Sequence, residues 1–349
     1  MALILKSLPD LSDVGARRRF ADQVSADSTI VFGTTREATT VAGSGPLMLR
    51  AVMDGREEVL AGRYRLVVDE DVYLILNSGT THATRIRSEQ PVFSFAVYFA
   101  ESLVTEVLGW RRNGEDDLLE RGGRVPPVAT RFAENLRPHD HCVSPVLRYL
   151  MHVCREQCSE PLWYDEQLHF LLERVIAGRE LEEARVTSLR AVRARTRREI
   201  HRRIARATDY ILSNYEAPLD LQSMAEVACL EKHHFLKLFA MVHGLTPFEF
   251  LRRKRLVVAL RLLRHSDHSQ GEIARLAGLG TRHTLLRALK EFTGVSPQGY
   301  KRLADPDACG WQGEFARLLE SDRGRLPDGR HSPWRPIARS RTFDLAPLH

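Results

Sequence analysis

The sequence predicts an α+β protein in which a strand-rich N-terminal half precedes an all-helical C-terminal domain. Hydrophobic residues gather in short β-branched and aromatic runs between about residues 28 and 99, and from about residue 144 they recur with the period of a helix. A third observation is an internal repeat between residues 224 and 300. The 349 residues are enough for two domains, each with its own hydrophobic core.

The composition excludes several classes of protein. A hydrophobic content of 43% and a charged content of 28% are typical of a globular chain. No apolar run approaches the ~20 residues that a membrane-spanning helix needs, and residues 1–13 lack the pattern of an export signal. The five cysteines are scattered, which indicates reduced thiols rather than a secreted disulfide framework. We therefore expect a cytoplasmic protein with no membrane partner.

The N-terminal half contains four apolar runs that read as strands, at 46–53, 64–68, 72–76 and 92–99. The segments Asp54-Gly-Arg and Asn77-Ser-Gly-Thr between them have the composition of turns. Several short strands at this spacing predict a small antiparallel barrel or sandwich.

Two amphipathic helices are expected between about 144 and 186, because apolar residues share one face in each, as at Leu150 and Cys154 or at Leu168 and Leu172. Residues 179–198 are dense in Arg and Glu and read as an exposed linker, either helical or irregular. The segment after residue 304 has no period and reads as a largely disordered tail. The expected organisation is therefore a first domain at 1–178, a charged linker at 179–198, a helical domain at 199–303 and a tail at 304–349.

Charge is concentrated in the C-terminal helical region. Residues 191–303 carry 21 Lys and Arg against 10 Asp and Glu, whereas the remainder carries 30 basic and 35 acidic residues. A basic segment beside a mildly acidic one indicates a domain that docks on polyanions. From charge alone, a solvated helical surface remains an equal alternative.

The basic segment contains a repeat. Residues 224–230 recur at 273–279, and after an insertion near Gly280 the segment Gly244-Leu-Thr-Pro247 recurs as Gly294-Val-Ser-Pro297. Each copy predicts a short helix, a turn and a longer helix, so a helix-turn-helix unit occurs twice. The longer helices bury stripes with i, i+3, i+4, i+7 spacing: Phe235, Leu238, Phe239 and Val242 in the first copy, and Leu285, Ala288, Leu289 and Phe292 in the second.

Each longer helix presents a polar, cationic face, and the N-terminal part of such a helix fits the major groove, which is ~12 Å wide. A solvated face is the alternative, but two copies within a basic segment favour DNA binding. One long helix at 247–263 is expected to space the units about one turn of DNA, ~34 Å, apart. Its basic cluster at 252–255 reads either as a set of phosphate contacts or as a solvated helix start.

The second copy carries the most specific resemblance, through Ile273-Ala, Gly278-Leu279, Arg287, Leu289-Lys290 and Tyr300. On these motifs, residues 200–303 resemble the DNA-binding domain of the AraC/XylS family of bacterial transcription regulators. Leu285 and Leu289 replace a usual Phe pair, and Lys237 stands where Arg is common. The resemblance implies six positions that meet double-stranded promoter or operator DNA: Lys232, His233, Lys237, Arg282, His283 and Arg287.

The N-terminal half is similar to the cupin-like sensing domain of many members of that family, through residues 64–79 followed by Pro91-Val-Phe-Ser-Phe. The resemblance implies a cupin-like antiparallel β-barrel with helices that binds a small-molecule effector, forms a homodimer, or does both. It also implies RNA polymerase as a partner.

Two alternative functions stay open from the sequence. A cupin-type metalloenzyme needs two or three His with a Glu on neighbouring strands, but the strand region offers His82 with Glu57, Glu58 and Glu89. The best metal candidates elsewhere are His139-Asp-His141-Cys142, His152, Cys154 and Cys158, without any CxxC pair. We therefore expect no cofactor, no metal and no catalytic residues.

A low-specificity DNA coating protein is the other alternative, and competition against random duplex separates it from a regulator.

Overall fold

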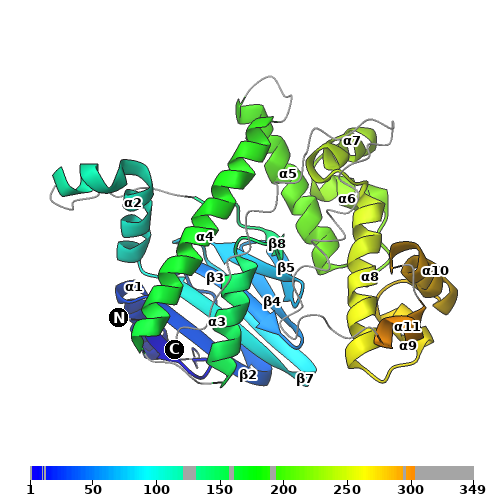
Figure 1. Ribbon diagram of the computed structural model, residues 1–349, viewed down its shortest axis with the longest axis horizontal. Coiled ribbons are helices and arrows are strands. Elements are labelled where there is room, and N and C mark those ends of the chain that lie inside the picture. Colours follow the sequence, from blue (N-terminus) through cyan, green and yellow to red (C-terminus); the bar gives the residue numbers. More distant parts are fainter. Residues whose placement is uncertain are drawn as a thin grey trace.

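The computed structural model describes residues 2–9, 11, 13–120, 131–156, 161–188, 194–293 and 296–302 (Figure 1). It confirms the α+β class, with a sheet and its covering helices in the N-terminal half and helices alone after residue 194. The predicted tail at 304–349 and residues 189–193 of the predicted linker lie outside the described residues.

The N-terminal half begins with a short strand and a helix, β1 (Leu3–Leu5) and α1 (Val14–Ala26). The sheet continues with β2 (Thr29–Thr39), β3 (Leu47–Met53), β4 (Arg56–Ala61), β5 (Tyr64–Asp69), β6 (Val72–Leu76), β7 (His82–Phe99) and β8 (Leu136–Pro138). Its helices are α2 (Glu101–Glu120), α3 (Ser144–Glu156) and α4 (Pro161–Ser188). All four strands expected from the apolar runs are present.

The strands form one mixed sheet in the order β1-β2-β7-β3-β6-β8, and β4 pairs with β5 and β7. Among the described residues no pairing joins β1 to β8, so the sheet stays open where the sequence predicted a barrel, and β1 pairs parallel to β2. Strand β7 begins ten residues before the apolar run at 92–99, because its first part pairs with β4 and with the end of β2. Pro91 lies in the irregularity between these two registers, where a residue without an N–H interrupts no ladder bond.

Both faces of the sheet are buried. Side chains alternate across a strand, so Leu47, Leu49 and Ala51 of β3 face one core while Met48 and Val52 face the other. The first core contains buried residues of α2, α3 and α4, such as Leu168 and Leu172. The expected apolar faces of the two helices are therefore confirmed at the positions where they cover the sheet.

Helix α4 continues past residue 178, the predicted end of the first domain. Glu180 accepts from Arg111 of α2 at 2.6 Å, and Glu182 accepts from Arg137 of β8 at 2.6 Å. The start of the predicted linker is thus a helix that packs on the N-terminal half.

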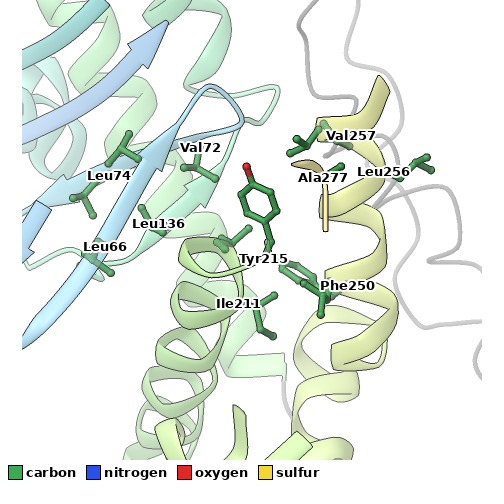
Figure 2. Close-up of a cluster of buried hydrophobic side chains, with 14 of the residues drawn as sticks. Leu66, Val72, Leu74, Leu136, Ile211, Tyr215, Phe250, Leu256, Val257 and Ala277 are labelled. Atoms are coloured by element: carbon green, nitrogen blue, oxygen red, sulfur yellow. The ribbon is translucent and has the colours of Figure 1, made fainter. Parts of the chain in front are cut away.

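The C-terminal half contains α5 (Ala194–Ser213), α6 (Leu221–Val227), α7 (Lys232–His243), α8 (Pro247–His265), α9 (Gln270–Leu276), α10 (Arg282–Thr293) and α11 (Pro297–Arg302). Its core is continuous with the second face of the sheet. Figure 2 shows Tyr215 between the sheet residues Leu66 and Val72 and the α8 residues Phe250 and Val257. The two halves therefore share one buried cluster. Among the described helices, none combines the length and hydropathy that a membrane span requires.

Candidate nucleic-acid interface

The first helix-turn-helix unit is built by local capping. Asp220 caps α6 by accepting from the Ser223 N–H at 2.8 Å. Glu231 caps α7 by accepting from the N–H groups of His233 and His234 at 3.0 and 3.2 Å. Gly244 ends α7 in the left-handed conformation, φ 72°, a common helix terminus. These caps set the start of α7 at Lys232.

The second unit repeats this arrangement. Ser269 and Glu272 form a capping box at the start of α9, and Thr281 Oγ1 accepts from the Thr284 N–H at 3.2 Å at the start of α10. The predicted stripes of α7 and α10 are buried at Phe235, Phe239, Leu285 and Leu289, whereas their last members, Val242 and Phe292, are partly buried against the same core.

The turns of the two units have the same backbone conformation. Cys229 and Gly278, which are 49 positions apart in the repeat, have φ values of 52° and 72°. A Cβ on Gly278 would lie 2.7 Å from the Tyr215 carbonyl oxygen, which explains glycine there. The inserted Gly280 has φ 79° with no neighbour within 4 Å of its Cβ position. The repeat seen in the sequence is therefore a repeat of backbone geometry.

The side chains predicted to meet DNA are all exposed, in equivalent positions of α7 and α10: Lys232, His233, Lys237, Arg282, His283 and Arg287. Within the described residues, Lys232, Lys237 and Arg287 form no ion pair, while Arg282 Nε donates to Gln270 Oε1 at 2.8 Å. Figure 1 shows α7 near one end of α8 and α10 beside the other end, with the sheet on the opposite side of α8 from α10. The structure thus places exposed cationic side chains at the N-terminal ends of α7 and α10, and α8 lies between these two helices in the chain.

Helix α8 starts as the sequence predicts, with Thr246 and Glu249 forming a capping box and Pro247 in the first turn. For its basic cluster at 252–255 the sequence predicted either phosphate contacts or a solvated helix start, but Arg253 and Lys254 are buried, and the partly exposed Arg252 and Arg255 are engaged within the protein. Arg252 pairs with Glu291 of α10, and Arg255 donates to the carbonyls of Tyr215 and Ala217 at 2.7 Å each. Arg253 is 2% exposed.

Lys254 is fully buried and binds the N-terminal half of the chain. Its Nζ donates to both Asp69 carboxylate oxygens at 2.9 and 2.7 Å and to Asp71 at 2.6 Å. Arg261, two turns further along α8, donates to Asp71 at 3.0 Å and lies 3.4 Å from Glu70. The acidic cluster Asp69-Glu70-Asp71 between two apolar strands was the signal for a basic partner, but the sequence does not say which of its basic residues that partner is.

Burial and charge act differently on the carboxyl groups of this cluster. Burial alone raises the pKa of Asp71, but Arg261 and Lys254 outweigh it and lower that pKa to about 2. At Glu70 burial is the larger effect and raises the pKa to about 7, in spite of Arg261. The junction between the sheet and α8 is therefore held by ionised Asp71 and carries a second carboxyl that titrates near neutrality.

A pocket of about 330 Å³ lies between α8 and α10, lined by Phe248, Leu251, Arg252, Arg255, Leu279, Thr284 and Arg287. It brings Arg287 of α10 next to two arginines of α8 that are already engaged. Of these three guanidinium groups, Arg287 is the exposed one without an ion pair in the part of the chain that the structure describes.

The metal candidates of the sequence do not come together in the described region. No three His, Cys, Asp or Glu side chains there converge as a metal site would require. His139 is buried with its Nδ1 2.9 Å from Ser144 Oγ, and burial lowers its pKa to about 3. Cys154 is a buried thiol whose pKa burial raises to about 12, and Cys158 lies outside the described residues.

Comparison with known proteins bears on the C-terminal half. A family model described as a helix-turn-helix domain matches residues 224–303. The chain is 27% identical over 93 residues to the probable transcriptional regulator LumQ of Photobacterium leiognathi, a match spanning 27% of this chain and 38% of LumQ. It is 26% identical over 93 residues to the multiple antibiotic resistance protein MarA of Salmonella typhimurium, spanning 27% of this chain and 73% of MarA.

The chain spans between 30% and 46% of the length of four further curated relatives. Among solved structures, the DNA-binding domain of AdpA in complex with a target DNA is 26% identical, covers 28% of this chain and 88% of that chain, and gives a TM-score of 0.27. The family model and the curated relatives agree with the duplicated units described above. The C-terminal part of this chain is a DNA-binding helix-turn-helix domain of the AraC type.

Proposed function

We propose that this protein is a sequence-specific transcription regulator whose helices α7 and α10 enter adjacent major grooves of promoter or operator DNA. The observation that carries the proposal is the equivalent exposure of cationic side chains at the starts of both helices, with Lys237 and Arg287 in matching positions. Arg binds guanine in bidentate fashion, and Lys binds guanine or phosphate.

The spacing of the two units supports the same proposal. Helix α8 has 19 residues, which makes it about 28 Å long at 1.5 Å per residue. Successive major-groove sites on one face of DNA are ~34 Å apart, a distance that two helices at the ends of such a spacer reach. The contacts of Arg252 and Arg255 hold α8 against α10 and against the turn after α5, which fixes the two units relative to each other.

Selection of bound sequences from random duplex DNA by the full chain tests the proposal. Specific affinity should exceed affinity for random duplex by ~10³-fold or more, whereas a coating protein would show little preference. Arg287→Ala should then cost ~1–3 kcal/mol and relax selectivity at one or two base pairs. Arg18→Ala, which removes the same charge from the exposed face of α1, is the control and should leave selectivity unchanged. Unchanged selectivity of Arg287→Ala would contradict its role.

For the N-terminal half we propose a sensing role with a small effector. Arg50 and Glu57 form a buried ion pair inside the apolar second face of the sheet, and Ser94 donates to Glu57 at 2.9 Å. Arg50 Nε has no hydrogen-bond partner in the described part of the chain. A buried guanidinium with a free donor suits a small carboxylic acid. A thermal-shift screen of such acids should show stabilisation that Arg50→Gln abolishes, and stabilisation of both forms alike would contradict this site.

We also propose that the chain forms a homodimer through α3 and α4. Tyr149, Leu162 and Phe170 expose 55%, 69% and 53% of their surface on these helices. Phe170→Ser should shift the sedimentation equilibrium toward monomer, and Glu173→Ser on the same helix is the control. A wild-type chain that is monomeric at all concentrations tested would contradict the dimer.

The proposal divides the chain into a sensing domain that runs from residue 1 to the end of α4 at Ser188, a DNA-binding domain that ends at residue 303, and a tail at 304–349. A bacterial regulator of this kind works in the cytoplasm, with RNA polymerase as its partner at the promoter. In vitro transcription from a promoter that contains a selected site, with and without the protein, tests whether the protein acts on RNA polymerase.

A further inference from the structure

The hairpin between β4 and β5 carries exposed basic residues toward the DNA-binding domain. Ala61 pairs with Tyr64 across a two-residue turn, and Gly62 has φ 59° with no neighbour within 4 Å of its Cβ position. Residues 62–65 are all exposed. Figure 1 shows β5 beside the C-terminal part of α5, the helix that leads into the first helix-turn-helix unit. The tip of this hairpin therefore projects beside that unit.

Two arginines from different domains meet at one tyrosine ring. The Arg63 guanidinium lies 5.3 Å from the Tyr64 ring centroid and donates to its hydroxyl at 3.2 and 3.3 Å. The guanidinium of Arg206, from α5, lies 5.4 Å from the same ring centroid. Neither arginine pairs with a carboxylate in the region that the structure describes.

The acidic residues of this region are already engaged. Glu58 pairs with Arg65, Glu199 pairs with Arg202 and Arg203, and Glu216 pairs with Arg56. Two like charges held against one ring repel each other unless an anion lies between or beside them. A guanidinium pair with a neighbouring hydroxyl has the donors that a phosphate oxygen accepts from.

The pair lies next to the start of the first recognition helix. One turn before Arg206 on α5, Arg203 donates to the carbonyl of Cys229 at 3.0 Å. Cys229 occupies the turn that precedes α7. In a helix-turn-helix complex the start of the recognition helix lies in the major groove, where phosphates line both edges of a channel ~12 Å wide.

We infer that Arg63, Tyr64 and Arg206 form a binding site for one phosphate of the DNA backbone beside α7, built jointly by the two domains. This inference rests on the proposed function. It adds a contact from the N-terminal half, so that DNA binding depends on how that half is docked against α5.

The test uses the full chain and a duplex obtained by the selection described above, with affinity measured over a range of salt concentrations. Arg63→Ala should weaken binding by about 3- to 10-fold and lower the slope of log K against log salt by about 0.9, the value for one phosphate. Arg206→Ala should behave in the same way. The double variant should lose one phosphate contact and not two, because both side chains hold the same group.

Arg65→Ala is the matched control, since Arg65 is a neighbouring exposed arginine that Glu58 already neutralises. It should change the affinity less than twofold, and thermal unfolding of all variants should match the wild type. An unchanged salt slope for Arg63→Ala, while Arg287→Ala still loses selectivity, would overturn this site and leave the proposed function intact. A wild-type chain without preference for any duplex would overturn the proposed function itself.

Discussion

Replacement of Lys254 by Met tests how the two halves of the chain are held together. Met keeps the apolar stem of the side chain, which lies in a well-packed part of α8, and removes the ammonium group. The structure then leaves Asp69 and Asp71, exposed by 4% and 6%, without their main counter-ion. Arg261 still neutralises Asp71 from 3.0 Å, so Asp69 carries most of the uncompensated charge.

Removing one partner of a buried ion pair costs about 3–5 kcal/mol. We expect Lys254→Met to fall in this range in urea unfolding of the full chain followed by far-UV circular dichroism. Because Lys254 joins the two halves, we expect the wild-type chain to unfold in a single transition and the Lys254→Met variant to unfold in two transitions, one for each half. Both effects have the same cause, which is the charge left at Asp69.

The double variant Lys254→Met with Asp69→Asn removes that charge and should recover most of the lost stability. Exposed pairs are worth little, so Arg65→Ala should cost less than about 1 kcal/mol and serves as the control. If the double variant were as unstable as the sum of the two single variants, the loss would come from packing and the electrostatic account would be wrong.

Two further predictions concern stability. Gly278→Ala should destabilise the chain by more than Gly280→Ala, because both glycines have positive φ but only Gly278 would place a Cβ 2.7 Å from a carbonyl oxygen. The difference between their urea unfolding midpoints should correspond to at least ~1 kcal/mol. Equal midpoints would contradict this contact. Glu70 has its pKa raised from 4.5 to about 7, so the native state keeps a proton that the unfolded chain has released. Protonated Glu70 therefore contributes its full share to the free energy of unfolding below pH 4.5, and about 3 kcal/mol of that free energy is lost as the pH rises through 7. Glu70→Gln should remove this decline in stability. Parallel profiles of stability against pH for the variant and the wild type would refute the prediction.

The local elements of this protein were within reach of the sequence. The apolar stripes at Phe235 and Leu285 repeat every three or four positions, so their spacing predicts the helices that contain them. Because the sequence of the first helix-turn-helix unit recurs, the repeat also predicts the second unit. The same periodicity predicts that α7 and α10 expose the face opposite the buried stripe, while the six positions expected to meet DNA came from the resemblance to the AraC/XylS family.

The tertiary structure decided how these elements combine. Strand β7 pairs with three other strands, and the sheet keeps open edges. Both features depend on contacts between residues far apart in the chain, and the alternation of apolar residues within a strand does not specify such contacts. Lys254 lies in a run of basic residues that would suit water or phosphate equally well. Its partners Asp69 and Asp71 are 185 and 183 positions away, so only the folded chain turns an apparent DNA contact into a buried bond between domains. Tyr64 and Arg206 are also far apart in the sequence and meet only in the folded chain, because charge and ring contacts act through space while a sequence pattern reports only neighbours along the chain.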